Sequence, residues 1–317
     1  MLHDPVWLAY SQWLSDHGVV ILASIFIAFT LLERLYYAVY QPKKYPDLDS
    51  LSSLATGLVS RGIRIVIDLF LLFTVYLWVF DNFKIFDFSN SLWGFAIGLL
   101  MHDFAWYWQH RMRHRMGFLW ADHQVHHSSN TYTFAVAQRA CFSGRLLRSP
   151  AFAMAALVGV SPSQFIVVAI IAQAWGIITH SNTIGKLGWL EGILVTPSMH
   201  RVHHGSQPQY IDKNYGEFTA IWDRMFGTYQ EENETVKFGL VTPLTTLNPI
   251  TIQFTGYGWL WRRLKSSSNW LDKINYLWRP PEWQHFTGQD AHQEMIAEEV
   301  SQAVSGRKLD DVTAEVI

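Results

Sequence analysis

The chain has 317 residues and a nearly balanced charge, with 24 Lys and Arg against 26 Asp and Glu. Only 16% of its residues are charged and 50% are hydrophobic, whereas an ordinary globular domain carries about 25% charged residues. The absence of a basic surplus argues against a nucleic-acid partner, and the single cysteine, Cys141, excludes an intrachain disulfide or a cysteine-based zinc site. We therefore expect an all-α integral membrane protein.

Apolar stretches predict the helices of this bundle in chain order. A full membrane span needs about 20 apolar residues, with a range of about 17–25, and several stretches are shorter than that. Ser161-Pro162 separates the last two stretches and predicts a helical hairpin. We expect four or five spans among residues 17–32 (continuing to Tyr40), 65–80, 91–108, 145–160 and 163–179.

Basic residues set the expected orientation. Lys43 and Lys44 follow the first stretch, and three arginines at 111, 113 and 115 follow the third. By the positive-inside rule both clusters face the cytosol, in a bacterial inner membrane or the endoplasmic reticulum, depending on the organism. We divide the chain into membrane helices (1–90), a histidine-rich region (91–235) and an amphipathic C-terminal segment with an acidic tail (236–317), whose stretch WRRLKSSSNWLDK is expected to lie flat on the membrane.

Histidines carry the chemical signal. Nine of the fourteen lie between positions 110 and 204, and their spacing is helical. Residues at offsets of three and four share one helix face, so each motif is expected to direct its imidazoles to a common point. The nine are His110 and His114; His123, His126 and His127; His180; and His200, His203 and His204.

Such a set indicates metal binding. One HxxHH motif is often a surface feature, but two of them beside HxxxH are hard to explain without a metal. Neutral imidazole suits Zn, Cu, Fe and Ni, and one structural zinc needs only four ligands. Nine ligands shared by two metals give four or five each and leave a position for oxygen or water, for which two iron ions fit best. The metalloprotease motif HExxH is absent.

Two residues on the helix before the first histidines are candidates for supporting the site. Asp103 and Tyr107 precede His110 and His114 in one stripe, at offsets of 4, 7 and 11 residues. Asp103 would accept the outer N–H of a ligating imidazole and fix its tautomer; alternatively it pairs with a nearby Arg. His102 faces away from the stripe and is expected to be an ordinary core histidine.

These motifs resemble the fatty acid hydroxylase superfamily, also called the sterol desaturase family. The resemblance covers roughly residues 95–230, namely DFAWYWQHRMRH, LWADHQVHHSS, HSN at 180–182 and TPSMHRVHHGSQPQYIDKNYGEFTAIWDRMFGTY. The continuation FGLVTPLTTLNP at 238–249 is similar to the subgroup that contains alkylglycerol monooxygenase.

The resemblance implies a membrane-bound non-haem di-iron oxygenase that hydroxylates or desaturates a C–H bond of an ether lipid, fatty acyl chain or sterol, using O2 and two electrons. Eight histidines match the three family boxes, and His180 matches an extra ligand. The subgroup is associated with tetrahydrobiopterin, although no pterin pocket is evident, and the lack of a His-Pro-Gly-Gly segment implies a separate electron donor. Supporting positions that match are Asp212, Asn214, Tyr215, Trp222 and Asp223.

A competing hypothesis is a non-catalytic membrane protein that transports or binds metal. Transporters place ionisable residues along a path within their spans, whereas these histidines lie at the ends of apolar stretches and beyond them. An inactive relative is a third possibility, and the complete histidine set argues against it. Metal flux into liposomes would separate transport from catalysis.

Overall fold

The computed structural model describes residues 5–42, 44–67, 73–89 and 91–284, and throughout these ranges the regular structure is helical, with only isolated β-bridges between loops. The all-α prediction is therefore confirmed. The helices are α1 (Pro5–Tyr40), α2 (Asp47–Ile67), α3 (Phe73–Phe83), α4 (Leu92–Arg115), α5 (Gly117–His127), η2 (Phe134–Gln138), α6 (Gly144–Val158), α7 (Pro162–Thr179), η3 (Gly188–Leu190), α8 (Pro197–His203), α9 (Ile221–Met225), α10 (Pro249–Ser266) and α11 (Trp270–Trp278).

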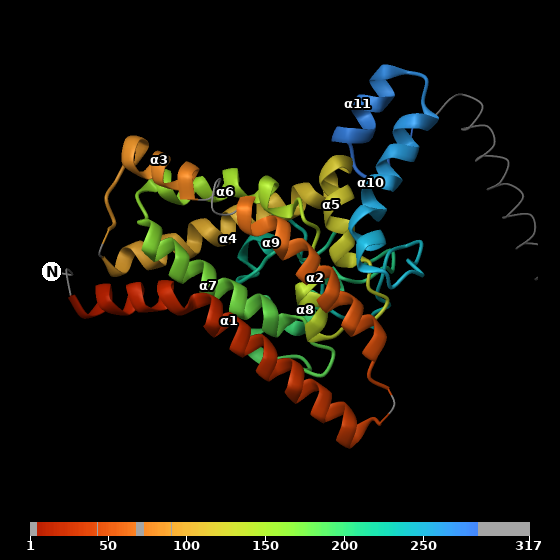
Figure 1. Cartoon of the computed structure of the whole chain (residues 1–317), viewed down its shortest axis with the longest axis horizontal. Helices are drawn as coiled ribbons and strands as arrows, with labels where there is room; N and C mark the ends of the chain where they lie inside the picture. Colours follow the sequence, from red (N-terminus) through yellow and green to blue (C-terminus); the bar gives the residue numbers. More distant parts are fainter. Residues whose placement is uncertain (1–4, 43, 68–72, 90, 285–317) are drawn as a thin grey trace, which may run out of the picture.

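Helix α4 lies at the centre of the bundle. It packs against α5, α6 and α7, while α1 packs along α7 and α3 along α6 (Figure 1). Aromatic side chains fill the core between them, including Tyr76, Phe80, Phe152 and Phe165. Because α4 ends in the first two histidines, this core fixes the position of the site.

The predicted hairpin is present as α6 and α7. Gly159 ends α6 in the left-handed region at φ 106°, and a Cβ there would overlap the carbonyl oxygen of Phe86, so only glycine fits. Ser161 then caps α7 in a reciprocal pair with Gln164, and Pro162 occupies the first turn, as expected for a helix start.

Two helices among the described residues are long and apolar enough to cross a membrane, Asp16–Tyr40 and Pro162–Thr179. Of the four or five membrane spans that were expected, the described residues thus contain two helices that meet the criteria of length and hydropathy. Helix α6 has 15 residues, which rise only about 22 Å against a hydrocarbon core of about 30 Å. Helix α4 buries a polar face that includes Asp103 and Gln109, and residues 68–72 of the stretch at 65–80 lie outside the described residues.

The chain turns sharply between the first two histidine motifs. Met116 is extended (φ −134°, ψ 123°) between α4 and α5, so the two helices meet at an angle and are not continuous. Helix α10 then supports α5 from outside: a Cβ at Gly256 would overlap the carbonyl oxygen of Ala121, which shows how closely the two backbones approach.

Candidate metal centre

Four helices bring all nine predicted histidines together in two groups. Within each group one ligand atom from every member lies within 4.8 Å of the others. Eight of the nine residues are buried and His126 is partly buried. The first group is His110, His114, His123, His127 and His203, and the second group is His126, His180, His200 and His204.

Each HxxHH motif contributes to both groups. His126 and His127 are neighbours on α5 yet belong to different groups, and so do His203 and His204 at the end of α8. Successive helical residues point about 100° apart, so adjacent imidazoles diverge. The expectation that each motif serves one common point is therefore wrong for the two HxxHH motifs, whereas it is confirmed for His110 and His114, which both belong to the first group.

Backbone carbonyls orient four of the imidazoles. A carbonyl oxygen only accepts, so the contacting Nδ1 carries the proton and Nε2 keeps its lone pair. The carbonyls come from loops and helix ends that no residue-type pattern marks in the sequence. The bonds run from His110 to Tyr215 (2.8 Å), His126 to Arg139 (3.0 Å), His180 to Gly176 (2.6 Å) and His203 to Lys213 (2.9 Å).

The inward nitrogens converge as metal ligands do. Nε2 of His180 lies 3.3 Å from that of His126 and 3.2 Å from that of His200. His126 and His180 both hold their protons on Nδ1, so their facing lone pairs repel unless a cation lies between them. Metal–imidazole bonds of about 2.0–2.1 Å place adjacent ligand nitrogens about 3 Å apart, so the spacing fits.

Other inward nitrogens lack a protein partner. Nε2 of His114, His203 and His204 is buried without a hydrogen bond among the described residues. Buried polar atoms are almost always satisfied, so three such atoms beside the converging pairs have the environment of metal-ligating nitrogens. The residues therefore fit two metal ions.

Burial keeps these imidazoles neutral. It is the largest cause that lowers the pKa of every histidine in both groups, and for most of them neighbouring imidazoles add to it. The pKa of His180 falls to about 4. At His114 the effect of burial on the pKa is partly offset by Asp212. Neutral imidazole is the form that binds a metal.

Asp212 and Asn214 support the site from a strained loop. Both lie in the left-handed region, at φ 62° and 55°, where non-glycine residues are uncommon. The Asp212 carboxylate is 3.6 Å from Nδ1 of His114 and also pairs with Arg115. Asn214 donates to the carbonyl oxygens of Met199 (3.0 Å) and Gln230 (2.7 Å), so it ties α8 to the loop.

Asp223 holds the backbone that orients His110. Its carboxylate accepts from the N–H groups of Tyr215 and Gly216, each at 2.8 Å, and from the Thr228 hydroxyl at 2.7 Å. These hydrogen bonds fix the peptide group between Tyr215 and Gly216, and the Tyr215 carbonyl oxygen of that peptide accepts the hydrogen bond from His110. Trp222 packs edge-on against Phe104 of α4, at 4.9 Å between ring centroids.

Asp103 and Tyr107, the two predicted supporting residues, contact the segment between Phe218 and Thr228. The Asp103 carboxylate accepts from the N–H groups of Phe218 (3.0 Å) and Thr219 (3.2 Å) and from the Thr219 hydroxyl. The Tyr107 hydroxyl bonds Thr228 and Arg111, both at 3.0 Å. The loop after α8 thus supplies the donors to Asp103, where the prediction expected the outer N–H of an imidazole.

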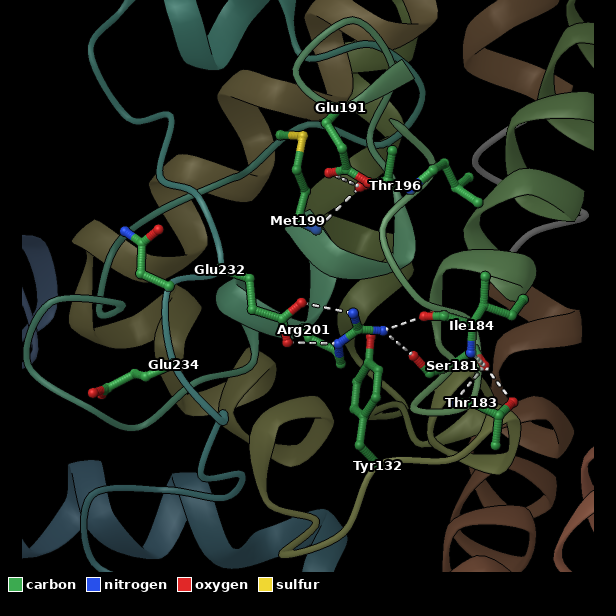
Figure 2. A network of polar contacts seen from close by, with 12 residues as sticks. Tyr132, Ser181, Thr183, Ile184, Glu191, Thr196, Met199, Arg201, Glu232 and Glu234 are labelled. Atoms are coloured by element: carbon green, nitrogen blue, oxygen red, sulfur yellow. Dashed lines mark hydrogen bonds and ion pairs between the residues drawn. The ribbon is translucent and has the colours of Figure 1, made fainter. Parts of the chain in front are cut away.

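Arg201 is a supporting residue that the sequence did not single out. It lies on α8 between His200 and His203 and bonds the Glu232 carboxylate through two nitrogens, at 2.8 and 2.6 Å. Its third nitrogen donates to the carbonyl oxygens of Ser181 (2.9 Å) and Ile184 (2.7 Å). Figure 2 shows this guanidinium joining α8 to the loop that follows His180. The only sign of its role in the sequence is its position between two histidines of the third motif.

A buried ion pair joins the first two motifs. Arg113 and Asp122 each precede a candidate ligand, and the pair is almost fully buried, at 4% and 0% side-chain exposure. Ser143 extends it by contacting both Asp122 and the Tyr257 hydroxyl. Arg113 is therefore not one of the solvent-facing cations that the orientation prediction counted.

A cavity adjoins both histidine groups. The non-atom space in and around it, open solvent included, is about 850 Å³. Its walls include Trp106, Ile177 and Glu217 beside His110, His123, His126, His180 and His200. Gln173, which also lines it, is exposed on α7. The cavity thus runs from an apolar helix to the converging imidazoles.

Known proteins share this region. A profile of the fatty acid hydroxylase family matches residues 95–228, which contain all nine histidines. Alkylglycerol monooxygenase of Danio rerio is 37% identical over 243 residues, 74% of this chain and 52% of that protein. The human alkylglycerol monooxygenase is 35% identical over 263 residues, 81% of this chain and 58% of that protein.

A bacterial relative is more distant. Ornithine lipid hydroxylase OlsE of Rhizobium tropici is 31% identical over 139 residues, 42% of this chain and 41% of that protein. The chain spans somewhat over half the length of the Danio rerio and human alkylglycerol monooxygenases. No solved structure matches it significantly.

Proposed function

Because this chain belongs to the fatty acid hydroxylase family, we propose that it is a membrane-bound oxidoreductase that hydroxylates or desaturates a lipid C–H bond. The reaction would use O2 and two electrons from a separate donor. The single observation that carries the proposal is the pair of histidine groups with converging Nε2 atoms.

The five histidines of the first group would hold one iron and the four of the second group another. Iron in both sites would supply the activation of O2 needed to attack an unactivated C–H bond. The protein's part is to keep the imidazoles neutral by burial and oriented by their Nδ1–H bonds. Four or five protein ligands leave coordination positions for O2 or water.

The proposed substrate is a lipid that reaches the site along α7. Gln173 is an exposed residue of the cavity wall and lies on one of the two helices able to cross a membrane, so an acyl or alkyl chain would enter from the bilayer along this helix. Trp106 and Ile177 would line its path and exclude water. Similarity to alkylglycerol monooxygenases over 74–81% of the chain favours an ether lipid, with a reduced pterin among the reductants to test.

The protein is proposed to be integral to the membrane, with the histidine groups at the cytosolic side. Helices α1 and α7 supply the apolar length, and both lead toward the end of the molecule that carries the histidines. Metal transport is the less favoured alternative: the ligands form two closed, buried groups at helix ends, whereas a transport path would continue through the spans.

The test is metal content with a matched pair of variants. Detergent-purified protein from iron-supplemented cells should contain about two irons per chain, one for each group. His126→Ala should lose metal at the second group and lose lipid oxidation. His17→Ala should retain both, because His17 is exposed on α1, contacts Trp13 of the same helix and belongs to neither histidine group.

Activity would be followed as oxygenated or desaturated lipid formed from ether-lipid, fatty acyl and sterol substrates, with tetrahydrobiopterin or a reductase as electron source. Wild-type turnover by His126→Ala would refute the assignment. Two zinc ions with no lipid product in any condition would leave the metal-binding geometry intact and argue against oxygenase chemistry.

A further inference from the structure

Helix α10 exposes an apolar stripe that the proposed reaction does not use. Ile250, Phe254 and Trp261 are each more than half exposed, at 53%, 55% and 59%. Their offsets of 4 and 11 residues place them within about 40° of one another around the helix. The buried residues of α10, such as Ile252 and Leu260, lie on the side that packs against the bundle.

Helix α11 repeats the pattern over nine residues. Trp270, Leu271, Ile274 and Trp278 are all exposed, between 44% and 66%, while Asp272 is buried toward the protein. In Figure 1 α10 and α11 stand out from the rest of the helices at one end of the molecule. The apolar side chains therefore face away from the protein core.

Cations border this surface. Residues 249–279 contain five Lys and Arg against a single acidic residue, Asp272, in a chain whose overall formal charge is −2. Lys265 lies over the Trp261 ring at 5.3 Å. The exposed cations beside the apolar side chains are Arg262, Lys265, Lys273 and Arg279.

We propose that α10 and α11 lie in the headgroup layer of an anionic lipid bilayer, with the apolar stripe at the acyl boundary. Tryptophan and basic residues around an apolar helix face are typical of interfacial helices, and anionic headgroups attract such cations. Lysine is depleted at protein interfaces, which disfavours a protein partner. A symmetric contact between two copies would bring the same cations together.

This placement would couple the bilayer to the metal centre. Helix α10 packs directly on α5, and α5 carries three of the nine histidines. A bilayer that holds α10 therefore also fixes the height of α5 above the acyl region. The inference rests on the membrane placement proposed above and not on the oxygenase reaction.

Site-directed spin labelling in nanodiscs tests it on the full chain. Single cysteines replace Phe254 and Ile274 on the stripe, Arg262 beside it, and Leu31 as a reference on the exposed face of α1. The native Cys141 is 2% exposed, so wild-type protein measures its background labelling. Each variant should keep the parent's melting temperature, because all four side chains are exposed.

In discs with anionic lipid, the labels at 254, 274 and 31 should collide more with O2 than with a water-soluble nickel chelate, and the label at 262 should show the reverse. Discs of phosphatidylcholine alone should move the labels at 254 and 274 toward water. If the labels at 254 and 274 are accessible to the nickel chelate while the label at 31 remains in lipid, the inference about α10 and α11 is wrong. The membrane placement of the protein would still hold.

Two further outcomes would also overturn it. Low access to both reagents, with spin–spin broadening that disappears on dilution with unlabelled chain, would assign the face to a second copy. Nickel accessibility at Leu31 as well would overturn the membrane placement itself.

Discussion

Replacing Glu232 with Gln should weaken metal binding at the second histidine group more than at the first. Glu232 accepts two hydrogen bonds from Arg201, at 2.8 and 2.6 Å, and Arg201 in turn holds the carbonyls of Ser181 and Ile184. Those carbonyls belong to the loop that begins at His180. The change therefore disturbs the position of one second-group ligand relative to α8.

The expected magnitude follows from burial. The pair is mostly enclosed, with 7% of the Arg201 side chain and 16% of the Glu232 side chain exposed. Removing one partner of a buried pair costs about 3–5 kcal/mol, and the partial exposure of Glu232 favours the lower figure. The Gln amide also places its NH2 group opposite one of the two donating nitrogens of Arg201, so one of the two hydrogen bonds is lost. Each loss of roughly 1.4 kcal/mol in the free energy of metal binding lowers the affinity of the second group for its metal tenfold.

The assay is iron per chain after dialysis against a weak chelator. Glu232→Gln should fall from about two irons to about one, since four of the five first-group ligands lie on α4 and α5. Glu282→Gln is the matched control: it removes the charge of an exposed contact with Arg115, and exposed pairs contribute about 0–1 kcal/mol. Equal loss from both groups, or no loss, would refute the proposed role of Arg201.

Two stability predictions concern the helices around the site. Asp122→Asn should lower the free energy of unfolding by about 3–5 kcal/mol, because it leaves the Arg113 guanidinium buried beside a neutral group; Asp87→Asn, which removes an exposed pair with Lys84, should cost about 0–1 kcal/mol. Gly256→Ala should lower the free energy of unfolding by about 1–3 kcal/mol, because the new Cβ would overlap the Ala121 carbonyl oxygen. Gly258→Ala is its control: a Cβ there makes only an ordinary contact, so the change should be neutral or stabilising by up to about 1 kcal/mol. Thermal unfolding of the four variants measures both differences, and equal melting temperatures within either pair would contradict the packing described.

The sequence predicted the local features well. Helical spacing placed the histidines of α4, α5 and α8, and Ser161-Pro162 marked the turn between α6 and α7. These features depend on neighbouring residues alone. The capping of α7 by Ser161 and Gln164 is of the same kind, because the partners are three residues apart.

Long-range contacts were not predictable in this way. Tyr215 and Arg139 lie 105 and 13 residues from the imidazoles of His110 and His126, and they meet these rings through backbone carbonyls, which every residue type has. Asp103 finds its donors 115 and 116 residues away, in a loop whose path the sequence does not specify. The composition of each histidine group likewise depends on how α4, α5, α7 and α8 are placed in the bundle.

The position of His180 suggests which metal would lie nearer to the oxidised carbon. Helix α7 lines the cavity through Gln173, Gly176 and Ile177 and ends directly in His180. Three of the four second-group histidines line that cavity, against two of five in the first group. A lipid chain that follows α7 from the bilayer would therefore reach the second group first. The first group is enclosed by α4, α5 and the loop at 212–215 and supplies only two of its five histidines to the cavity walls, so under the proposed function its metal would lie farther from the substrate.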